Sequence, residues 1–263
     1  MKKKWRMLLA LVLAVLLCMP VMTVRSEAAA RNVHVLMIGN SLTRSADGRN
    51  STVTHLKKLA EKQGITLDVE VVARGGAKLE DFSNPRKLKS LADRVIKKGK
   101  WDYIILQEYQ DLCVYSYSTY LNGTRKLCST IRKYSPRAKI CLNAVWPETR
   151  NMRHGGQIYN PRQQKNHIFW NTDKVAAADG IPRRQIIYSG KGFWGYQHLS
   201  DRGTRKRLYS DYEHGSDIGY YLNALCIAQR ILPKQVSSLC WYGKAGKYEA
   251  ELMMKVVEQF NPK

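Results

Sequence analysis

Residues 33–43 read VHVLMIGNSLT, and this stretch decides the fold that we predict for the chain of 263 residues. Five of the six residues before Gly39 are apolar, and the polar pair Asn40-Ser41 follows the glycine at once. A nearly continuous apolar run of this length is typical of a strand buried on both faces, as in a parallel sheet. Ligands of open α/β sheets bind beyond the carboxyl ends of such strands, so Ser41 stands where that architecture places its chemistry. Taken alone, the stretch is more simply an ordinary strand-to-helix turn, because Gly, Asn, Ser and Thr favour turns.

Strand and helix patterns alternate along the rest of the chain. Further strands are predicted at residues 66–73, 101–107, 138–145 and 185–188, and helices at residues 51–63, 85–98, 120–134, 165–179, 216–231 and 248–260. The polar, glycine-containing residues 151–164 are predicted to form a long loop. The first of these helices could point its positive end toward Ser41. The alternation implies one α/β domain whose parallel sheet carries helices on both faces.

Three predicted strand ends carry residues that suit the hydrolysis of an ester. Such a hydrolase needs a nucleophile, a base, and donors that stabilise the oxyanion of the tetrahedral intermediate. Ser41 is the candidate nucleophile. Its own N–H, the N–H of Gly75 after the second strand, and the side-chain amide of Gln107 after the third are the candidate oxyanion donors.

The candidate base lies far along the chain, in the segment Asp211-Tyr212-Glu213-His214. At this spacing the Asp211 carboxylate can reach Nδ1 of His214, which would fix the tautomer and support the imidazolium. Nε2 of His214 would then face Ser41. The alternative is that Asp211 or Ser216 merely caps the helix that begins near Asp217, and Ser216 is the better candidate for that cap.

Together these residues resemble the SGNH/GDSL hydrolase superfamily of esterases and lipases. Within it they are most similar to the bacterial group whose nucleophile motif reads Gly-Asn-Ser-Phe-Thr. The other matches are a glycine after the second strand, a Leu-Gln-Glu segment where Gly-x-Asn-Asp is usual, and a final Asp-x-x-His. The matching segments, in chain order, are residues 39–43, 75–76, 106–108 and 211–214. The resemblance implies a flavodoxin-like, three-layer α/β/α fold and a Ser-His-Asp hydrolase that needs no metal.

Residues 1–30 are predicted to be a signal peptide. Three lysines and an arginine precede an apolar run at residues 7–18, and the alanines at positions 28–30 offer a cleavage site. The apolar run is short for a bilayer span, which needs about 20 residues. We therefore expect a hydrolase domain at residues 31–263 that is secreted or held at the cell surface, with no stable membrane span after cleavage. An uncleaved anchor is the alternative.

The charge of the chain favours anionic partners. The formal net charge is +23, and removal of the signal peptide takes away five basic and one acidic residue, which leaves +19. Such a field attracts an acidic glycan, a wall polymer or a membrane surface. Nucleic acid is not expected, because the chain carries an export signal and no recognisable nucleic-acid-binding motif. A general adaptation of the surface without a specific partner is the alternative.

No cofactor is expected from the sequence. The five cysteines after residue 30 match no zinc spacing, and their odd number leaves at least one thiol unpaired; no pairing is predicted. There is no Gly-x-Gly-x-x-Gly segment or phosphate loop. Several aromatic residues could form a sugar-stacking platform, although such residues are more often part of a core: Trp146, Trp170, Trp194 and Tyr196.

We therefore predict a secreted serine esterase that cleaves small O-acyl esters, in particular O-acetyl esters on a carbohydrate. Ser41 is its nucleophile, His214 its base, and Asp211 the residue that orients the base. The preference for an acetylated glycan rests on export, charge and the tendency of the family. The alternative is a binding module for a glycan or a cell wall that has kept the fold without catalysis.

Overall fold

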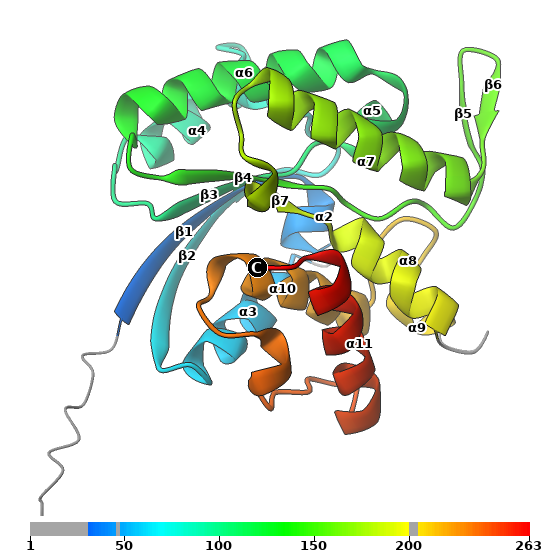
Figure 1. Cartoon of the computed structure of the whole chain (residues 1–263). Helices are drawn as coiled ribbons and strands as arrows, with labels where there is room; N and C mark the ends of the chain where they lie inside the picture. Colours follow the sequence, from blue (N-terminus) through cyan, green and yellow to red (C-terminus); the bar gives the residue numbers. More distant parts are fainter. Residues whose placement is uncertain (1–30, 46–47, 200–204) are drawn as a thin grey trace, which may run out of the picture. The chain divides into compact units, whose positions relative to one another are not determined.

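A five-stranded parallel sheet forms the centre of the computed structural model (Figure 1). The structure describes residues 31–45, 48–199 and 205–263, so the predicted signal peptide lies outside the described residues. The strands follow the order β2-β1-β3-β4-β7 across the sheet. Their bounds are β1 (Arg31–Gly39), β2 (Ile65–Ala73), β3 (Tyr103–Leu106), β4 (Lys139–Asn143) and β7 (Ile186–Ile187). The strand that begins the predicted domain is therefore an inner strand, and its carboxyl end lies between the ends of β2 and β3.

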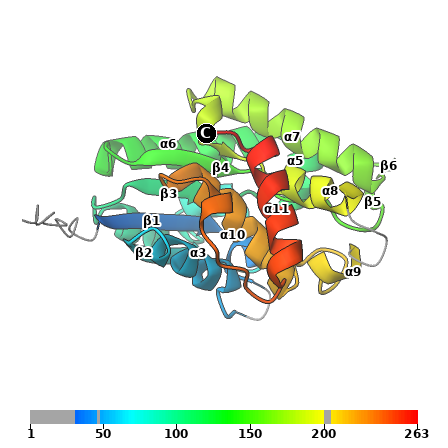
Figure 2. The ribbon, with the colours of Figure 1, turned by 60° about the horizontal axis from the view of Figure 1, so that its bottom comes forward.

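Helices cover both faces of this sheet, as Figures 1 and 2 show. One face carries α3 (Ser51–Glu61), α8 (Ser189–Leu199), α10 (Asp217–Ile231) and α11 (Lys247–Phe260). The other carries α4 (Lys89–Ile96), α5 (Gln110–Tyr115), α6 (Tyr117–Tyr134) and α7 (Pro161–Ala178). Each face has its own cluster of buried apolar side chains. The predicted three-layer α/β/α arrangement is confirmed.

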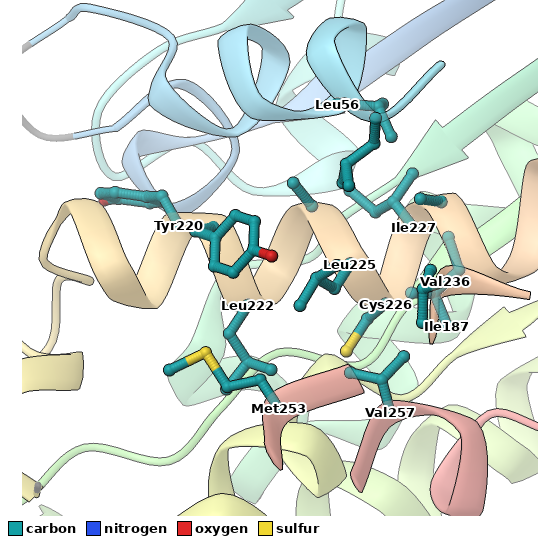
Figure 3. Packing of buried hydrophobic residues seen from close by; sticks show 14 of the residues in the cluster. Leu56, Ile187, Tyr220, Leu222, Leu225, Cys226, Ile227, Val236, Met253 and Val257 are labelled. Carbon is teal, nitrogen blue, oxygen red and sulfur yellow. The ribbon is translucent and has the colours of Figure 1, made fainter. Parts of the chain in front are cut away.

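Helix α10 is the centre of the first of these clusters (Figure 3). Apolar side chains occur all round it, so it is a buried helix rather than an amphipathic one. Its Leu225 and Ile227 lie in the same cluster as Leu56 of α3. Helix α11, near the C-terminus, adds Met253 and Val257 to this cluster. This packing fixes the start of α10, which follows His214 by only three residues.

Two helices begin four residues away from their predicted starts, α7 earlier and α4 later. Helix α7 begins at Pro161, because Asn160 and Gln163 form a reciprocal capping box and proline suits the first helical position. Helix α4 begins only at Lys89, because a turn at Asn84 precedes it, in which the side chain of that residue accepts a hydrogen bond from the N–H of Arg86.

The predicted long loop at residues 151–164 is not a loop throughout. It contains the antiparallel hairpin of β5 (Met152–His154) and β6 (Gln157–Tyr159), and its last four residues belong to α7. The sequence did not predict the helices α2 (Ser41–Arg44), α5, α8 and α9 (Arg205–Leu208). Three 3₁₀ turns lie at Leu79–Ser83, Arg183–Gln185 and Val236–Ser238.

All five cysteines of the described residues are free thiols. Four of them are buried in the two apolar clusters or beside them, and only Cys240 is exposed. Burial raises the pKa of Cys141 and of Cys226 to about 12, because the charged thiolate is disfavoured away from water. These side chains therefore serve as small apolar core residues. No helix of the described residues combines the length and hydropathy that a bilayer span requires.

Candidate active site

Ser41 lies at the carboxyl end of β1, an inner strand of the sheet. Strand β1 ends at Gly39 and the short helix α2 begins at Ser41, so the chain turns within two residues. A Cβ atom at Gly39 would lie 2.3 Å from Oγ1 of Thr43 and 2.8 Å from Oε1 of Gln107, closer than real Cβ atoms come. Only glycine fits this position, and the absence of its side chain lets the turn pack against the end of β3.

Asn40 locks the same turn from within. Its side chain is buried; Oδ1 accepts a hydrogen bond of 3.1 Å from the N–H of Leu42, and Nδ2 donates one of 3.2 Å to the carbonyl of Ala77. The first bond caps α2. The second ties the residues after β1 to the loop after β2. The sequence motif contains this asparagine, but its bracing role depends on a contact 37 residues away.

The structure brings Ser41, His214 and Asp211 together in one hydrogen-bonded chain. Nε2 of His214 lies 3.0 Å from Oγ of Ser41, and Nδ1 of His214 lies 2.8 Å from Oδ2 of Asp211. With the Nδ1–H tautomer, His214 donates to the carboxylate and accepts from the serine hydroxyl. This is the geometry in which an imidazole takes a proton from a nucleophile while a carboxylate supports the resulting charge.

The other oxygen of Asp211 holds the backbone of the same segment. Oδ1 accepts hydrogen bonds of 2.7 Å from the N–H of Glu213 and 2.6 Å from the N–H of His214. Burial alone would raise the pKa of Asp211, but these two bonds and the one from the His214 ring outweigh it, so that pKa lies below its usual value. Asp211 is therefore a carboxylate at neutral pH.

The segment that carries the pair is fastened at both ends. Tyr209 and Gly215 form an isolated antiparallel bridge across it. The indole N–H of Trp146 donates a hydrogen bond of 2.8 Å to the carbonyl of Glu213. Ser216 then caps α10, with its Oγ accepting from the N–H of Gly219 at 3.2 Å. Ser216 is thus the cap, as the sequence favoured, and Asp211 is left for His214.

A cavity of about 270 Å³ opens beside Ser41. Ser41 and Gly75 both line it, so the structure places two of the three predicted oxyanion donors at one site. Within the described part of the chain, neither backbone N–H donates a hydrogen bond to another residue. Both are therefore available to an oxyanion in the cavity. The side chains around it are those of Asn40, Ser41, Arg44, Ser45 and Arg74, with Gly48 and Gly75 completing the wall.

The structure does not bring the Gln107 amide into this cavity. Oε1 of Gln107 accepts hydrogen bonds from Oγ1 of Thr43 at 2.7 Å and from the N–H of Asn40 at 3.3 Å, while its Nε2 donates to the carbonyl of Glu108. The side chain is buried, and all its polar atoms are engaged beneath the turn that carries Ser41. Gln107 has the position of a brace, and its role as a third oxyanion donor stays a prediction from the motif.

The aromatic residues considered for a sugar platform are dispersed. Trp146 and Tyr196 are fully buried, and Trp170 is exposed on α7. Trp194 alone of the four lines a second cavity, of about 430 Å³, to which Asp211, Glu148 and Gln197 also contribute. No group of three His, Cys, Asp or Glu residues in the described part of the chain could hold a metal ion.

Comparison with known proteins finds solved structures that share this architecture. No protein-family model and no curated protein matches the chain. A DUF4886 family protein from Bacteroides uniformis has a similar structure, with a TM-score of 0.72 and 21% identity over 87% of this chain and 94% of that one. A protein from Slackia heliotrinireducens assigned to the SGNH hydrolases has a TM-score of 0.57 and 23% identity over 76% of this chain and 100% of that one. A lipase/acylhydrolase from Enterococcus faecalis has a TM-score of 0.56 and 19% identity over 76% of this chain and 95% of that one. The resemblance predicted from the motifs is thus confirmed in the architecture: the chain has the fold of the SGNH/GDSL hydrolases.

Proposed function

We propose that this protein is a serine hydrolase that cleaves small O-acyl esters, and that O-acetyl esters on carbohydrate are its substrates. The observation that carries the proposal is the chain of hydrogen bonds from Asp211 through His214 to Ser41 at the carboxyl end of β1. Ser41 also lines a cavity, so a substrate can reach it. The solved lipase/acylhydrolase with this fold supports the reaction class.

The reaction follows from the geometry. Oγ of Ser41 attacks the ester carbonyl while Nε2 of His214 accepts the hydroxyl proton, and the N–H groups of Ser41 and Gly75 stabilise the oxyanion. The intermediate collapses with cleavage of the ester C–O bond, and His214 returns its proton to the departing alcohol. His214 then takes a proton from water as the water oxygen attacks the acyl-enzyme. The bond between the acyl carbon and Oγ breaks, His214 returns the proton to Oγ of Ser41, and the carboxylic acid is released. One such oxyanion donor can be worth about 3–4 kcal/mol of transition-state stabilisation.

The lining of the cavity favours a short acyl group. None of the seven residues around it carries an aliphatic or aromatic side chain. A long acyl chain would meet only polar and charged groups there, and would gain little from leaving water. A short acyl group leaves part of this cavity to the adjoining part of the alcohol side, and the larger cavity beyond Asp211, with Trp194 and several polar groups, suits the rest of the sugar. Together with the predicted signal peptide, this supports an acetylated glycan outside the cytoplasm as the substrate.

The experiment is the hydrolysis of p-nitrophenyl acetate and of an acetylated polysaccharide by the purified protein, beside Ser41→Ala and the matched control Ser129→Ala. Ser129 is exposed on α6, away from the site. We expect Ser41→Ala alone to lose activity. Equal rates in Ser41→Ala and the unmodified protein would remove Ser41 from the chemistry. No turnover of either substrate by the unmodified protein would favour the alternative, a glycan- or wall-binding module.

A further inference from the structure

Two arginines stand at the nucleophile, and the proposed reaction uses neither. Arg44 is the last residue of α2, and Arg74 directly follows β2. Strands β1 and β2 are parallel neighbours with Gly39 paired to Ala73, and the N–H of Arg74 donates to the carbonyl of Gly39 at 3.3 Å. The sheet register therefore brings both arginines to the same edge, where they line the cavity that contains Ser41.

Neither guanidinium has a carboxylate partner among the described residues. Other basic side chains are paired, such as Lys87 with Asp81 and Arg207 with Glu249, but no ion pair between described residues involves Arg44 or Arg74. The described residues that complete the cavity are Asn, Ser and Gly, which carry no charge. Two like charges at the wall of one cavity repel each other and attract an anion.

The neighbouring larger cavity has a different charge pattern. Glu148 and Asp211 line it and no Lys or Arg of the described residues does, although Arg150 pairs with Glu148 at 2.9 Å and the ammonium group of Lys165 lies over the ring of Trp194. An anionic group is therefore attracted more strongly beside Arg44 and Arg74 than on the far side of Asp211. This difference would orient an anionic substrate in one direction across Ser41.

We propose that the ester cleaved at Ser41 belongs to an anionic compound, and that Arg44 and Arg74 bind a carboxylate or phosphate group of it beside the scissile bond. The inference rests on the proposed hydrolase function of Ser41. The planar guanidinium presents two parallel N–H donors that match either oxyanion, and charge-assisted hydrogen bonds of this kind are about twice as strong as neutral ones. The two residues are specificity determinants, since they contact the substrate away from the reacting carbonyl.

The test compares three aryl acetates that differ in one group. The carboxylate is 4-acetoxybenzoate, the phosphate is 4-acetoxyphenyl phosphate, and the neutral match is 4-acetoxybenzamide. We expect the unmodified protein to prefer at least one anionic ester over the neutral one by about tenfold or more in kcat/KM. The better of the two anions identifies the group. Because the interaction is electrostatic and partly exposed, the preference should shrink as sodium chloride is raised.

The variants are R44Q/R74Q and the control R94Q/R137Q. Arg94 and Arg137 are exposed and line no described cavity with Ser41, so the control removes the same net charge elsewhere. We expect R44Q/R74Q to lose the preference and R94Q/R137Q to keep it. R44K/R74K, which keeps the charge but not the planar fork, should retain a part. If R44Q/R74Q does not fold by circular dichroism, the two single variants are measured instead.

The outcomes separate this inference from the proposed function. A preference that survives in R44Q/R74Q, or no preference in the unmodified protein, overturns the inference while Ser41-dependent hydrolysis still stands. If no ester is hydrolysed, binding to Ser41→Ala by calorimetry decides. Tighter binding of 4-acetoxybenzoate or 4-acetoxyphenyl phosphate than of 4-acetoxybenzamide, lost on adding R44Q/R74Q, supports the anion site. Equal binding of all three overturns it.

Discussion

At the scale of single residues, the Asp211 carboxylate accepts from the ring of His214 through one oxygen and from two backbone N–H groups through the other. Replacement of Asp211 by asparagine separates these two roles. The side-chain oxygen of the new amide could still accept from the backbone N–H groups, but its nitrogen would face Nδ1 of His214 and force the wrong tautomer. We expect Asp211→Asn to lower kcat by about 10³–10⁴-fold with little change in KM. Steady-state kinetics on p-nitrophenyl acetate measures this, with the exposed Asp102→Asn as control. An unchanged kcat would show that Asp211 is only structural.

Gln107 offers a second residue-scale prediction, which separates the two roles that it could have. As a brace, it satisfies the hydroxyl of Thr43 and the N–H of Asn40 in a buried place. Gln107→Ala should then lower the free energy of unfolding by at least about 2 kcal/mol, measured by urea denaturation. An oxyanion donor alone would lower kcat at unchanged stability. Gln259→Ala, at an exposed position of α11, is the control and should leave stability unchanged.

The sequence predicted the reacting groups of the site better than their supports. Ser41, Asp211 and His214 were recognised because the chemistry requires those residue types at that spacing, and the structure places them in contact. The bracing by Asn40 and Trp146 was not predicted, since each depends on a hydrogen bond to a residue remote in the chain. For the same reason the motif could place Gln107 at the strand end but could not say where its amide points.

At the scale of elements, α8 forms although its sequence argues against a helix. It contains three glycines in eleven residues, and glycine weakens a helix by about 1 kcal/mol relative to alanine. Tertiary packing explains the difference. A Cβ at Gly190 would lie 2.2 Å from the carbonyl oxygen of Val145, and one at Gly195 would lie 2.4 Å from the ring of Phe260. The glycines let α8 approach β4 and α11 closely, which no local pattern reveals.

This close approach predicts the effect of one methyl group. Gly190→Ala would push α8 against the backbone after β4, which cannot yield as a side chain can. We expect a loss of about 1–3 kcal/mol or more in the free energy of unfolding, seen as a lower melting temperature. Gly75→Ala is the matched control, because a Cβ added at Gly75 would have no atom within 4 Å and the φ of Gly75 is not positive. Equal melting temperatures for both variants would contradict the packing argument.

The elements that the sequence did predict were those with strong patterns. The inner strands β1 and β3 were found because they are buried and read as apolar runs, and the edge strand β2 because its residues alternate and are β-branched. The predicted strand ends were right to within about three residues. The hairpin of β5 and β6 was missed because two strands of three residues, largely exposed, carry no alternation of apolar and polar residues.

At the scale of the whole molecule, the ionisation of Glu108 links stability to pH. This side chain is fully buried, and burial raises its pKa to about 8 although the N–H groups of Tyr109 and Leu79 donate to Oε1. In the unfolded chain a glutamate loses its proton near pH 4.5. Between these values the folded protein binds one proton more than the unfolded one. The contribution of Glu108 to stability therefore falls as pH rises through this range, by up to about 1.4 kcal/mol per unit.

Glu108→Gln removes this dependence, because an amide does not titrate and its Oε1 can accept the same two hydrogen bonds. We expect the stability of the variant relative to the unmodified protein to increase steadily from pH 5 to pH 8, whatever its value at pH 5. Urea denaturation at four pH values measures it. For the exposed Glu251→Gln the corresponding difference should stay flat. A flat difference for Glu108→Gln as well would mean that Glu108 is ionised throughout.

The distance along the chain between Ser41 and His214 has a consequence for how activity develops during folding. The two residues are 173 positions apart, and contacts with α10 and Trp146 help to hold the segment that carries His214. A chain that ends before this segment can therefore contain Ser41 at the end of β1 without its candidate base. We expect activity to appear only when the segment with His214 has docked. Recovery of activity during refolding would then report the completed molecule and no partly folded form.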